Sequence, residues 1–258
     1  MSQPQPRPLA LITGPTAGIG RCFAFQLAER GHDLVLVARN RTALESVAEE
    51  LRSQHGVDVE VLAADLTDRG ALGRVEERLA STEHPVDLLV NNAGFGLKEP
   101  FLDNDLESEQ QMLDVLVVAV LRLSHVAMTG MVARGSGGVI NVSSVAGYLP
   151  RGTYSAAKAY VTSLSRWADA TYRPQGVRTM ALCPGFTRTE FHGRMEVSQD
   201  SAPSWLWLYA DRLVRHTLRD FDNGKSVSVP DVRYKAITAV AQYVPAGLLA
   251  RFQSVGRK

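Results

Sequence analysis

Short runs of apolar residues alternate along this chain with longer segments of helical periodicity. Such a run, bounded by glycine or polar residues, is typical of a strand buried on both faces of a parallel sheet. Strands that alternate with helices, without an internal repeat or a linker, predict a doubly wound α/β fold with helices on both faces. The expected strands are residues 9–13, 34–38, 57–63, 86–90, 139–142 and 177–182.

The chain departs from this alternation after residue 189. Residues 190–204 have no clear period, and we expect a substrate lid at about 190–215, with the apolar stretch from Trp205 to Tyr209 beside the site. The amphipathic tail from residue 248 predicts a helix packed on its own domain, with membrane or partner contact as the alternative. The remaining expectations are a disordered tail at 1–8, a single domain at 9–258, helices at 211–221 and 231–243, and a last strand at 226–229.

Composition narrows the possible functions. The chain has 258 residues and 45% apolar content, which suits one large domain. Its formal charge of +1 gives no reason to expect a nucleic acid partner. Two isolated cysteines, Cys22 and Cys183, indicate neither a disulfide framework nor a metal site. The polar, proline-containing start and the lack of about 18 consecutive apolar residues predict a cytoplasmic protein with no integral membrane span.

A glycine-rich turn follows the first expected strand and leads into a helix. Glycines let the backbone turn tightly and approach a pyrophosphate, while the first N–H groups of the helix attract its charge. A tight connection between strand and helix, without a ligand, would use the same residues. The candidate cofactor-binding residues of this turn are Gly14, Thr16, Gly18, Ile19 and Gly20.

The second expected strand ends at Ala38 and is followed by Arg39. In a dinucleotide-binding sheet this position faces the adenosine ribose, where an acid suits a free 2′-hydroxyl and an arginine suits a 2′-phosphate. Arg39 therefore favours NADP(H) over NAD(H). The alternative is a solvated arginine at a helix start, which the helix dipole disfavours slightly.

Two further strand ends carry candidate cofactor contacts. Asp65 could bond the adenine amino group or cap the helix that begins near Asp68. The stretch Asn91-Asn92-Ala93-Gly94 would let the backbone approach a dinucleotide, or it could form a turn stabilised by asparagine side chains.

The fifth expected strand delivers Ser143 and Ser144 at its carboxyl end, where open α/β sheets bind ligands. Tyr154 and Lys158 follow, four residues apart on one helical face. A nearby cation favours the phenolate, so we expect Lys158 to lower the pKa of Tyr154 toward the range useful for proton transfer. Alone, this pair occurs by chance on many helices.

Together these motifs resemble the short-chain dehydrogenase/reductase family over almost the whole chain. The resemblance implies a Rossmann-type fold and an oxidoreductase, and the Val-Ala-Arg ending at Arg39 is most similar to NADPH-dependent members. The matching motifs, in the family's order, are Thr13-Gly14-x-x-x-Gly18-Ile19-Gly20, Asp65, Asn91-Asn92-Ala93-Gly94, Asn141-Val142-Ser143-Ser144, Tyr154-x-x-x-Lys158 and Pro184-Gly185.

The resemblance also implies residue roles. Tyr154 would be the general acid/base, and Ser144 would hold the carbonyl oxygen. Lys158 would lower the pKa of Tyr154 and bond the nicotinamide ribose, so both Tyr154 and Lys158 would also contact the cofactor. Cofactor contacts are further implied for Asn92, Ala93 and Gly94, and the carboxamide would be oriented by Thr189 and by the stretch containing Pro184, Gly185 and Thr187.

Two departures from the family pattern concern this site. The family usually has an asparagine in the long helix expected at 106–134, where it holds a water that relays protons to the lysine, and that register falls on Leu116. Asp114 is close in sequence but points elsewhere on a helix. Ser144 precedes Tyr154 by ten residues rather than about thirteen, which leaves Ser143 and Ser144 as alternatives for the catalytic serine.

Two functions are compatible with these residues. The first is an NADPH-dependent enzyme that interconverts a carbonyl and a secondary alcohol on an apolar ketoacyl, aromatic or steroid-like substrate. The second, motivated by Leu116, is an NADP(H)-binding regulatory or interaction protein with impaired turnover. Family resemblance also implies a homodimer or homotetramer that pairs through the long helices.

Overall fold

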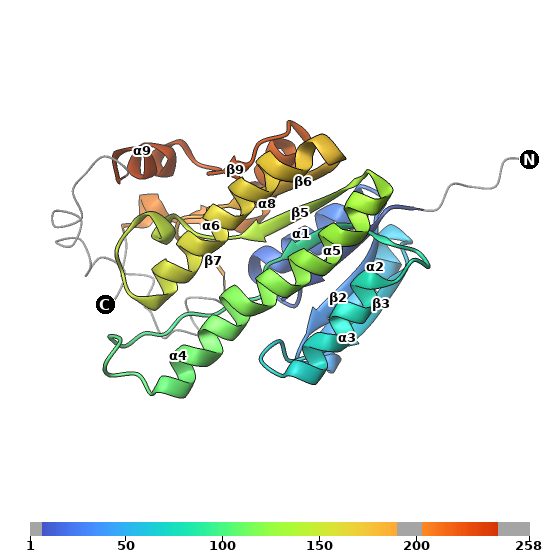
Figure 1. Cartoon of the computed structure of the whole chain (residues 1–258), viewed down its shortest axis with the longest axis horizontal. Helices are drawn as coiled ribbons and strands as arrows, with labels where there is room; N and C mark the ends of the chain where they lie inside the picture. The colour runs from blue at the N-terminus through green and yellow to red at the C-terminus, as the bar shows by residue number, and fades with distance from the viewer. Residues whose placement is uncertain (1–6, 190–202, 242–258) are drawn as a thin grey trace, which may run out of the picture.

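The computed structural model describes residues 7–189 and 203–241, and these form one parallel sheet between two helical layers (Figure 1). The seven strands lie in the order β3-β2-β1-β4-β5-β6-β9, and every neighbouring pair is parallel. The expected doubly wound fold is therefore confirmed. The strands are β1 (Leu9–Thr13), β2 (Asp33–Ala38), β3 (Val59–Ala63), β4 (Val86–Asn91), β5 (Gly137–Val142), β6 (Val177–Leu182) and β9 (Val227–Ser228).

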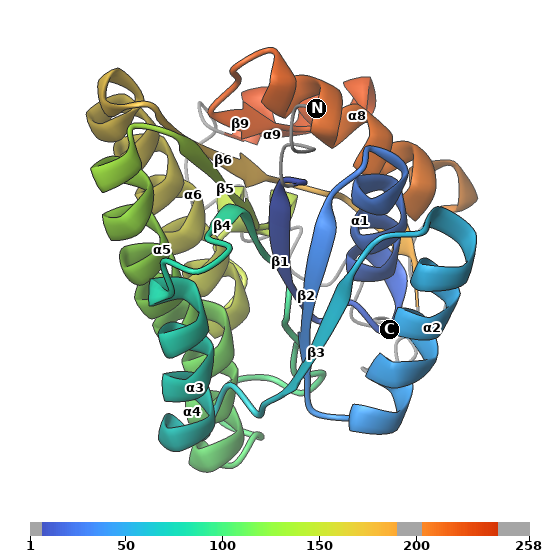
Figure 2. The ribbon, with the colours of Figure 1, turned by 90° about the vertical axis from the view of Figure 1, so that its right-hand side faces the viewer.

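Helices cover both faces of the sheet (Figure 2). One face carries α1, α2 and α8, and the other carries α3, α4, α5 and α6. The sheet has an apolar core on each side because neighbouring residues of a strand point to opposite faces, so Leu11 and Ile12 enter different clusters. The helices are α1 (Gly18–Glu29), α2 (Arg41–His55), α3 (Arg69–Ala80), α4 (Leu106–Leu113), α5 (Val120–Arg134), α6 (Thr153–Tyr172), α8 (Ala210–Asp222) and α9 (Val232–Ala241).

The long helix expected at 106–134 is continuous but contains a wider π-helical turn, η1 (Asp114–Ala119), between α4 and α5. By its length, and by a mean hydropathy of 1.9 over an 18-residue window, this helix could cross a membrane, but 44% of that window is buried inside the molecule. Leu123 and Met131 pack in the core beside the sheet. The helix therefore serves this fold as a core helix.

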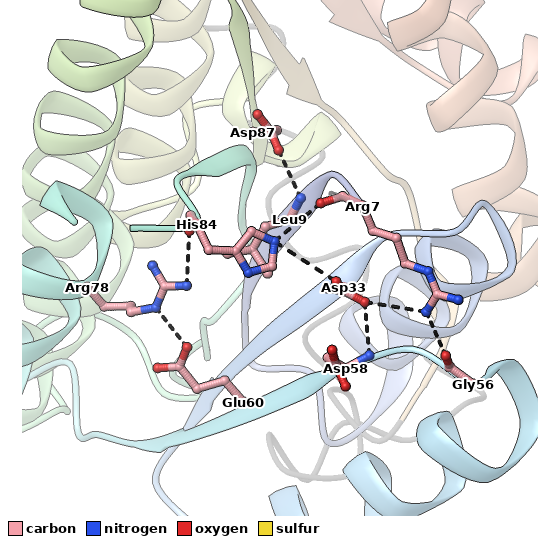
Figure 3. Close-up of polar contacts among 9 residues, drawn as sticks. All are labelled: Arg7, Leu9, Asp33, Gly56, Asp58, Glu60, Arg78, His84 and Asp87. Carbon is pink, nitrogen blue, oxygen red and sulfur yellow. Dashed lines mark hydrogen bonds and ion pairs between the residues drawn. The ribbon is translucent and has the colours of Figure 1, made fainter. Parts of the chain in front are cut away.

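The amino ends of the strands are joined by polar contacts (Figure 3). Arg7 donates a 2.6 Å hydrogen bond to the Gly56 carbonyl, and its guanidinium lies 3.7 Å from the Asp33 carboxylate. The Leu9 amide donates to Asp87 at the start of β4. Arg7, the seventh residue of the expected disordered tail, is thus bound to the sheet, and residues 1–6 of that tail lie outside the described residues.

The expected lid falls in two parts. Residues 190–202 and the tail from 248 lie outside the described residues. Residues 204–206 form a short 3-10 turn, and β8 (Leu208–Tyr209) pairs with β7 (Thr187–Arg188). Leu206, Trp207 and Leu208 are buried in the core. This stretch packs against residues 186–188, since the Leu208 amide donates to the Phe186 carbonyl and the Trp207 ring contacts the Phe186 ring. Its role beside the substrate stays a prediction. The expected helices at 211–221 and 231–243 correspond to α8 and α9.

Candidate active site

Ser144, Tyr154 and Lys158 meet at the carboxyl end of β5. Ser144 directly follows this strand region and caps a 3-10 turn at Val145–Tyr148, while Tyr154 lies in the first turn of α6. The Ser144 hydroxyl hydrogen-bonds the Tyr154 phenol. The Lys158 ammonium lies 5.7 Å from the centre of the Tyr154 ring. The short 3-10 turn accommodates the ten-residue spacing, because strand and helix fix the two side chains independently.

Ser143 faces away from this group. Its side chain is buried, and its hydroxyl lies 2.7 Å from both the Lys158 carbonyl oxygen and the Thr162 hydroxyl. The structure therefore distinguishes the two serines by position: Ser144 lies beside the phenol and Ser143 lies behind the lysine.

Burial dominates the electrostatics of this group. It raises the pKa of Tyr154 to about 12, an effect that the hydrogen bond from Ser144 partly opposes. Burial also lowers the pKa of Lys158 to about 8. The expected lowering of the Tyr154 pKa by Lys158 is not seen in the free chain, where burial dominates and raises that pKa. The Lys158 ammonium donates a 2.7 Å hydrogen bond to the Val142 carbonyl.

Leu116 lies in the π-helical turn and faces the site, as its register predicts. It is buried against Met112 and Ala157, in a cluster that also contacts Tyr154. A Cβ built on Gly94 would come within 2.7 Å of a Leu116 methyl and 3.9 Å of the Lys158 nitrogen, so these groups are close neighbours. Asp114 instead accepts a hydrogen bond from Gln110.

The glycine-rich turn has the geometry of an anion-binding loop. Gly14 and Gly18 have φ values of 67° and 54°, a region that favours glycine. A Cβ on Gly20 would lie 2.1 Å from the Gly14 carbonyl oxygen, so only glycine lets α1 approach the turn this closely. No side chain caps α1, which leaves its first N–H groups available to a ligand. Thr16 and Ile19 are half-buried in the same turn.

The ends of β1 and β4 are joined through Asn92 and Thr13. The Asn92 amide donates to the Thr13 and Gly14 carbonyls at 2.9 and 3.0 Å. The Thr13 hydroxyl accepts from the backbone amides of Asn92 and Ala93, both at 2.9 Å. Asn92 thus holds the glycine-rich turn in place through its side chain. Its partner Thr13 belongs to the recognised motif, but nothing local in the sequence indicates this contact.

A buried amide network continues below this layer. The Asn91 side-chain amide donates to the Ser124 hydroxyl and to the side-chain oxygen of Asn141, at 3.0 and 2.8 Å. Asn141 donates in turn to the Ser165 hydroxyl at 2.9 Å. These contacts join β4 and β5 to the helices α5 and α6, and sequence reasoning missed Ser124 and Ser165 because buried serines on apolar helices carry no distinctive pattern.

Arg39 and Asp65 lie at neighbouring strand ends. Arg39 is exposed after β2, and in the described part of the chain no hydrogen bond or ion pair engages its guanidinium. Asp65 accepts from the backbone amide and hydroxyl of Thr67, at 3.0 and 2.8 Å. Asp68, rather than Asp65, caps α3 by accepting from the Ala71 amide. The capping alternative for Asp65 was therefore wrong.

The stretch from Pro184 to Thr189 is held by a residue that sequence reasoning missed, Tyr234 of α9. Its ring packs on Gly185, where a Cβ would come within 2.0 Å of the ring. Its hydroxyl accepts from the Phe186 amide and donates to the Leu206 carbonyl. The Thr187 hydroxyl is buried and donates to the Gly185 carbonyl, whereas Thr189 and Pro184 lie at the two ends of this stretch. No local signal connects Tyr234 to a turn about fifty residues away.

A groove of about 490 Å³ lies between α6 and the 3-10 turn at Val145–Tyr148. It is lined by Tyr148, Thr162, Arg166 and Trp167, among others, and Tyr154 and Lys158 do not line it. The groove is therefore separate from the candidate catalytic group.

Fold and site together define a dinucleotide-binding α/β protein with a serine-tyrosine-lysine group. A family model described as short chain dehydrogenase matches residues 8–200. The chain therefore belongs to the short-chain dehydrogenase/reductase family, and the resemblance seen in its motifs is confirmed.

Solved structures that are similar cover nearly the whole chain. A short-chain dehydrogenase from Sphingobium yanoikuyae in complex with NADPH is 35% identical, with a TM-score of 0.84 over 94% of this chain and 95% of that one. The bulky-bulky ketone specific alcohol dehydrogenase from Comamonas testosteroni is 30% identical, with a TM-score of 0.80 over 94% of each chain.

Curated relatives include the very-long-chain 3-oxoacyl-CoA reductases. The protein from Anas platyrhynchos is 33% identical over 76% of this chain and 63% of its own length. The Homo sapiens protein is 32% identical over 70% of this chain and 60% of its own length. The matched region thus spans about three fifths of these relatives.

Proposed function

We propose that the protein is an NADPH-dependent oxidoreductase that interconverts a carbonyl and a secondary alcohol on an apolar substrate. The observation that carries this proposal is the hydrogen-bonded pair of Ser144 and Tyr154, with Lys158 one helical turn away. These residues lie at the carboxyl end of β5, the edge where open α/β sheets bind their ligands. The alternative is a regulatory protein without turnover. The relatives named above are reductases and dehydrogenases, and they do not support it.

The residues present fit NADP(H). Gly14, Gly18 and Gly20 form a tight turn over the uncapped start of α1, which suits a pyrophosphate. The exposed Arg39, with no acid at the end of β2, suits the 2′-phosphate. We assign cofactor contacts also to Asp65, Ala93, Gly94 and the stretch with Pro184, Gly185, Thr187 and Thr189. Bound NADPH supplies the hydride for reduction of the carbonyl.

The protein groups supply proton transfer and positioning. The raised pKa of Tyr154 keeps the phenol protonated at neutral pH, so it can donate a proton to the carbonyl oxygen. Ser144, beside the phenol, orients that oxygen by a hydrogen bond. Lys158 supplies positive charge below the phenol, which favours the phenolate left after donation.

The surroundings of Tyr154 favour an apolar substrate. Phe95, Leu97 and Leu113 pack with Leu116 and Tyr154 in one cluster, so the phenol is bordered by hydrocarbon. The named relatives reduce very-long-chain 3-oxoacyl-CoA or prefer bulky ketones. We propose a ketone on a ketoacyl, aromatic or steroid-like skeleton as the substrate of this chain.

The assembly and location are also proposals. Large apolar side chains are exposed on α5 and α6, which lie side by side on one layer: Leu121, Tyr160 and Trp167. They support a homodimer or homotetramer that pairs through these helices. The near-neutral charge and the presence of only two cysteines in the sequence support a cytoplasmic location.

The rate of NADPH consumption by the purified protein tests this function. The panel should contain 3-oxoacyl thioesters of increasing chain length, bulky aromatic ketones, steroid ketones and small polar ketones. We expect turnover with the apolar members and little with the polar ones. No turnover with any carbonyl, while NADPH still binds, would contradict the proposal.

A further inference from the structure

The side chain and the main chain of Lys158 are each hydrogen-bonded to one of two consecutive residues at the end of β5, Val142 and Ser143. Its ammonium donates a 2.7 Å hydrogen bond to the Val142 carbonyl. Its backbone carbonyl accepts a 2.7 Å hydrogen bond from the Ser143 hydroxyl. A change at Ser143 would therefore act on the main chain of the lysine, while the ammonium contact is made by the neighbouring residue.

Ser143 and Thr162 are themselves fixed by several hydrogen bonds. β5 lies between β4 and β6 in the sheet, and the Ser143 amide donates a 2.7 Å bond to the Leu182 carbonyl of β6. The Thr162 hydroxyl lies 2.7 Å from Ser143 and 3.0 Å from the Lys158 carbonyl, so one hydroxyl can donate to the other and both can reach the same acceptor. The Thr162 hydroxyl also lies 3.7 Å from the thiol of Cys183.

The packing of α6 explains why this contact matters. Beside the buried apolar residues Ala157, Val161 and Ala168, its inner face carries polar residues at every third or fourth position, and all of these are buried: Ser155, Lys158, Thr162, Ser165 and Asp169. Apolar side chains can slide past one another at little cost, whereas hydrogen bonds require specific partner atoms. Asn141 and Thr179 hydrogen-bond the later turns of α6 at Ser165 and Asp169. The Ser143 hydroxyl, with Thr162 beside it, instead contacts α6 at Lys158 itself.

We propose that Ser143, together with Thr162, is a positioning residue that sets the location of the Lys158 ammonium. Ser143 does not touch the reacting atoms, since it is buried behind Lys158 and its hydroxyl is engaged there. This inference rests on the proposed function only for its kinetic readout.

Substitutions can separate positioning from simple stabilisation. Ser143→Ala and Thr162→Val remove one hydroxyl each with little change in shape, and Thr162→Ser restores the hydroxyl. Ser165→Ala is the matched control, because it also removes a buried hydroxyl from α6, one that contacts Asn141 and its own helix rather than Lys158.

The kinetic readout is kcat and KM for ketone reduction. We expect Ser143→Ala and Thr162→Val to lower kcat by about tenfold or more, since small displacements of catalytic groups cost up to about 100-fold. KM for the ketone should stay near the wild-type value. Thr162→Ser and Ser165→Ala should keep the wild-type kcat, even where the melting temperature falls.

A second readout does not need turnover. The chain has only five lysines, so the 13Cε signal of Lys158 can be assigned with Lys158→Met and titrated by NMR. We expect Ser143→Ala and Thr162→Val to move the titration midpoint of Lys158 toward that of an ordinary lysine, and Ser165→Ala to leave it unchanged.

The proposal is overturned if Ser143→Ala and Thr162→Val lose thermal stability as Ser165→Ala does but keep the wild-type kcat and Lys158 titration. If the wild type reduces no carbonyl, the proposed function fails while the Lys158 titration still decides the positioning role. If Ser143→Ala does not fold, the comparison of Thr162→Val with Thr162→Ser carries the test.

Discussion

At the scale of single residues, the site is a small group of polar side chains placed in a dry environment. Tyr154 and Lys158 are shifted in opposite directions by the same cause, since burial penalises the charged form of each. Both shifts favour neutral side chains in the free chain. Keeping Lys158 charged beside the Tyr154 phenol therefore lowers the free energy of unfolding.

That cost predicts a pH dependence for Lys158→Met. The pKa of Lys158 falls from 10.5 to about 8 on folding, so between these pH values the unfolded chain holds more protons. The free energy of unfolding of the wild type should therefore rise with pH across this window, relative to Lys158→Met, by about 3 kcal/mol. Chemical denaturation at pH 7.5 to 10.5 (a range of about 3 units) measures the difference. If the difference in the free energy of unfolding between the two proteins does not change with pH, folding does not lower the pKa of Lys158.

Arg39 sets the second residue-scale prediction. Arg39→Ala should weaken NADPH binding by roughly 1.5–3 kcal/mol, because a charge-assisted hydrogen bond to the 2′-phosphate is lost, and should leave NADH binding nearly unchanged. Calorimetric titration with both cofactors measures this. Arg74→Ala, an exposed arginine on α3, is a control of equal charge. Equal losses of affinity for NADPH and NADH would show that Arg39 does not bind the 2′-phosphate.

At the scale of elements, the glycine-rich turn depends on the close approach of α1 to the end of β1. Gly20→Ala places a methyl 2.1 Å from the Gly14 carbonyl oxygen, which is backbone and cannot move aside alone. We expect this variant to lose NADPH affinity by at least about tenfold, a change of about 1.4 kcal/mol. Equilibrium fluorescence titration measures it.

Gly73→Ala is the control for that substitution. Gly73 lies within α3, and its added Cβ would meet no atom within 4 Å. It should keep NADPH binding and gain up to about 1 kcal/mol of stability from helix propensity. Wild-type affinity in Gly20→Ala would show that the turn does not need this close approach.

Sequence reasoning was most successful for elements with a local signal. The bounds of β1 and β6 match the predicted 9–13 and 177–182, because each segment is short and is bounded by proline, glycine or polar residues. The π-helical turn around Leu116 was not predicted, since its residues keep helical periodicity. The pairing of β7 with β8 was also missed, because a two-residue strand has no period.

The structure brings the motif residues of the site together, and the residues that support them were missed. Ser144, Tyr154 and Lys158 come together as their motif implies, and the structure separates Ser144 from Ser143 where the sequence left both open. Tyr234 and Ser165 were missed because their contacts join segments far apart in the chain. Such pairings are set by the fold rather than by neighbouring residues.

At the scale of the whole molecule, exposed apolar groups on α5 and α6 predict self-association. Trp167, 56% exposed, should be buried by a second copy, so Trp167→Glu should shift the protein toward monomer. Sedimentation velocity measures the distribution. Trp205→Glu is the control, because Trp205 is 57% exposed but lies on a different segment. A wild type that is only monomeric would contradict the proposed dimer or tetramer.

At this scale the molecule is proposed to be a working NADPH-dependent reductase whose proton donor is Tyr154. Its most direct test is NADPH consumption by the wild type and by Tyr154→Phe, side by side, against apolar ketones. Phenylalanine keeps the ring but removes the phenolic proton, so kcat should fall by about 100-fold or more with NADPH binding retained. Turnover that persists in Tyr154→Phe, or a wild type that binds NADPH without turnover, would contradict the account.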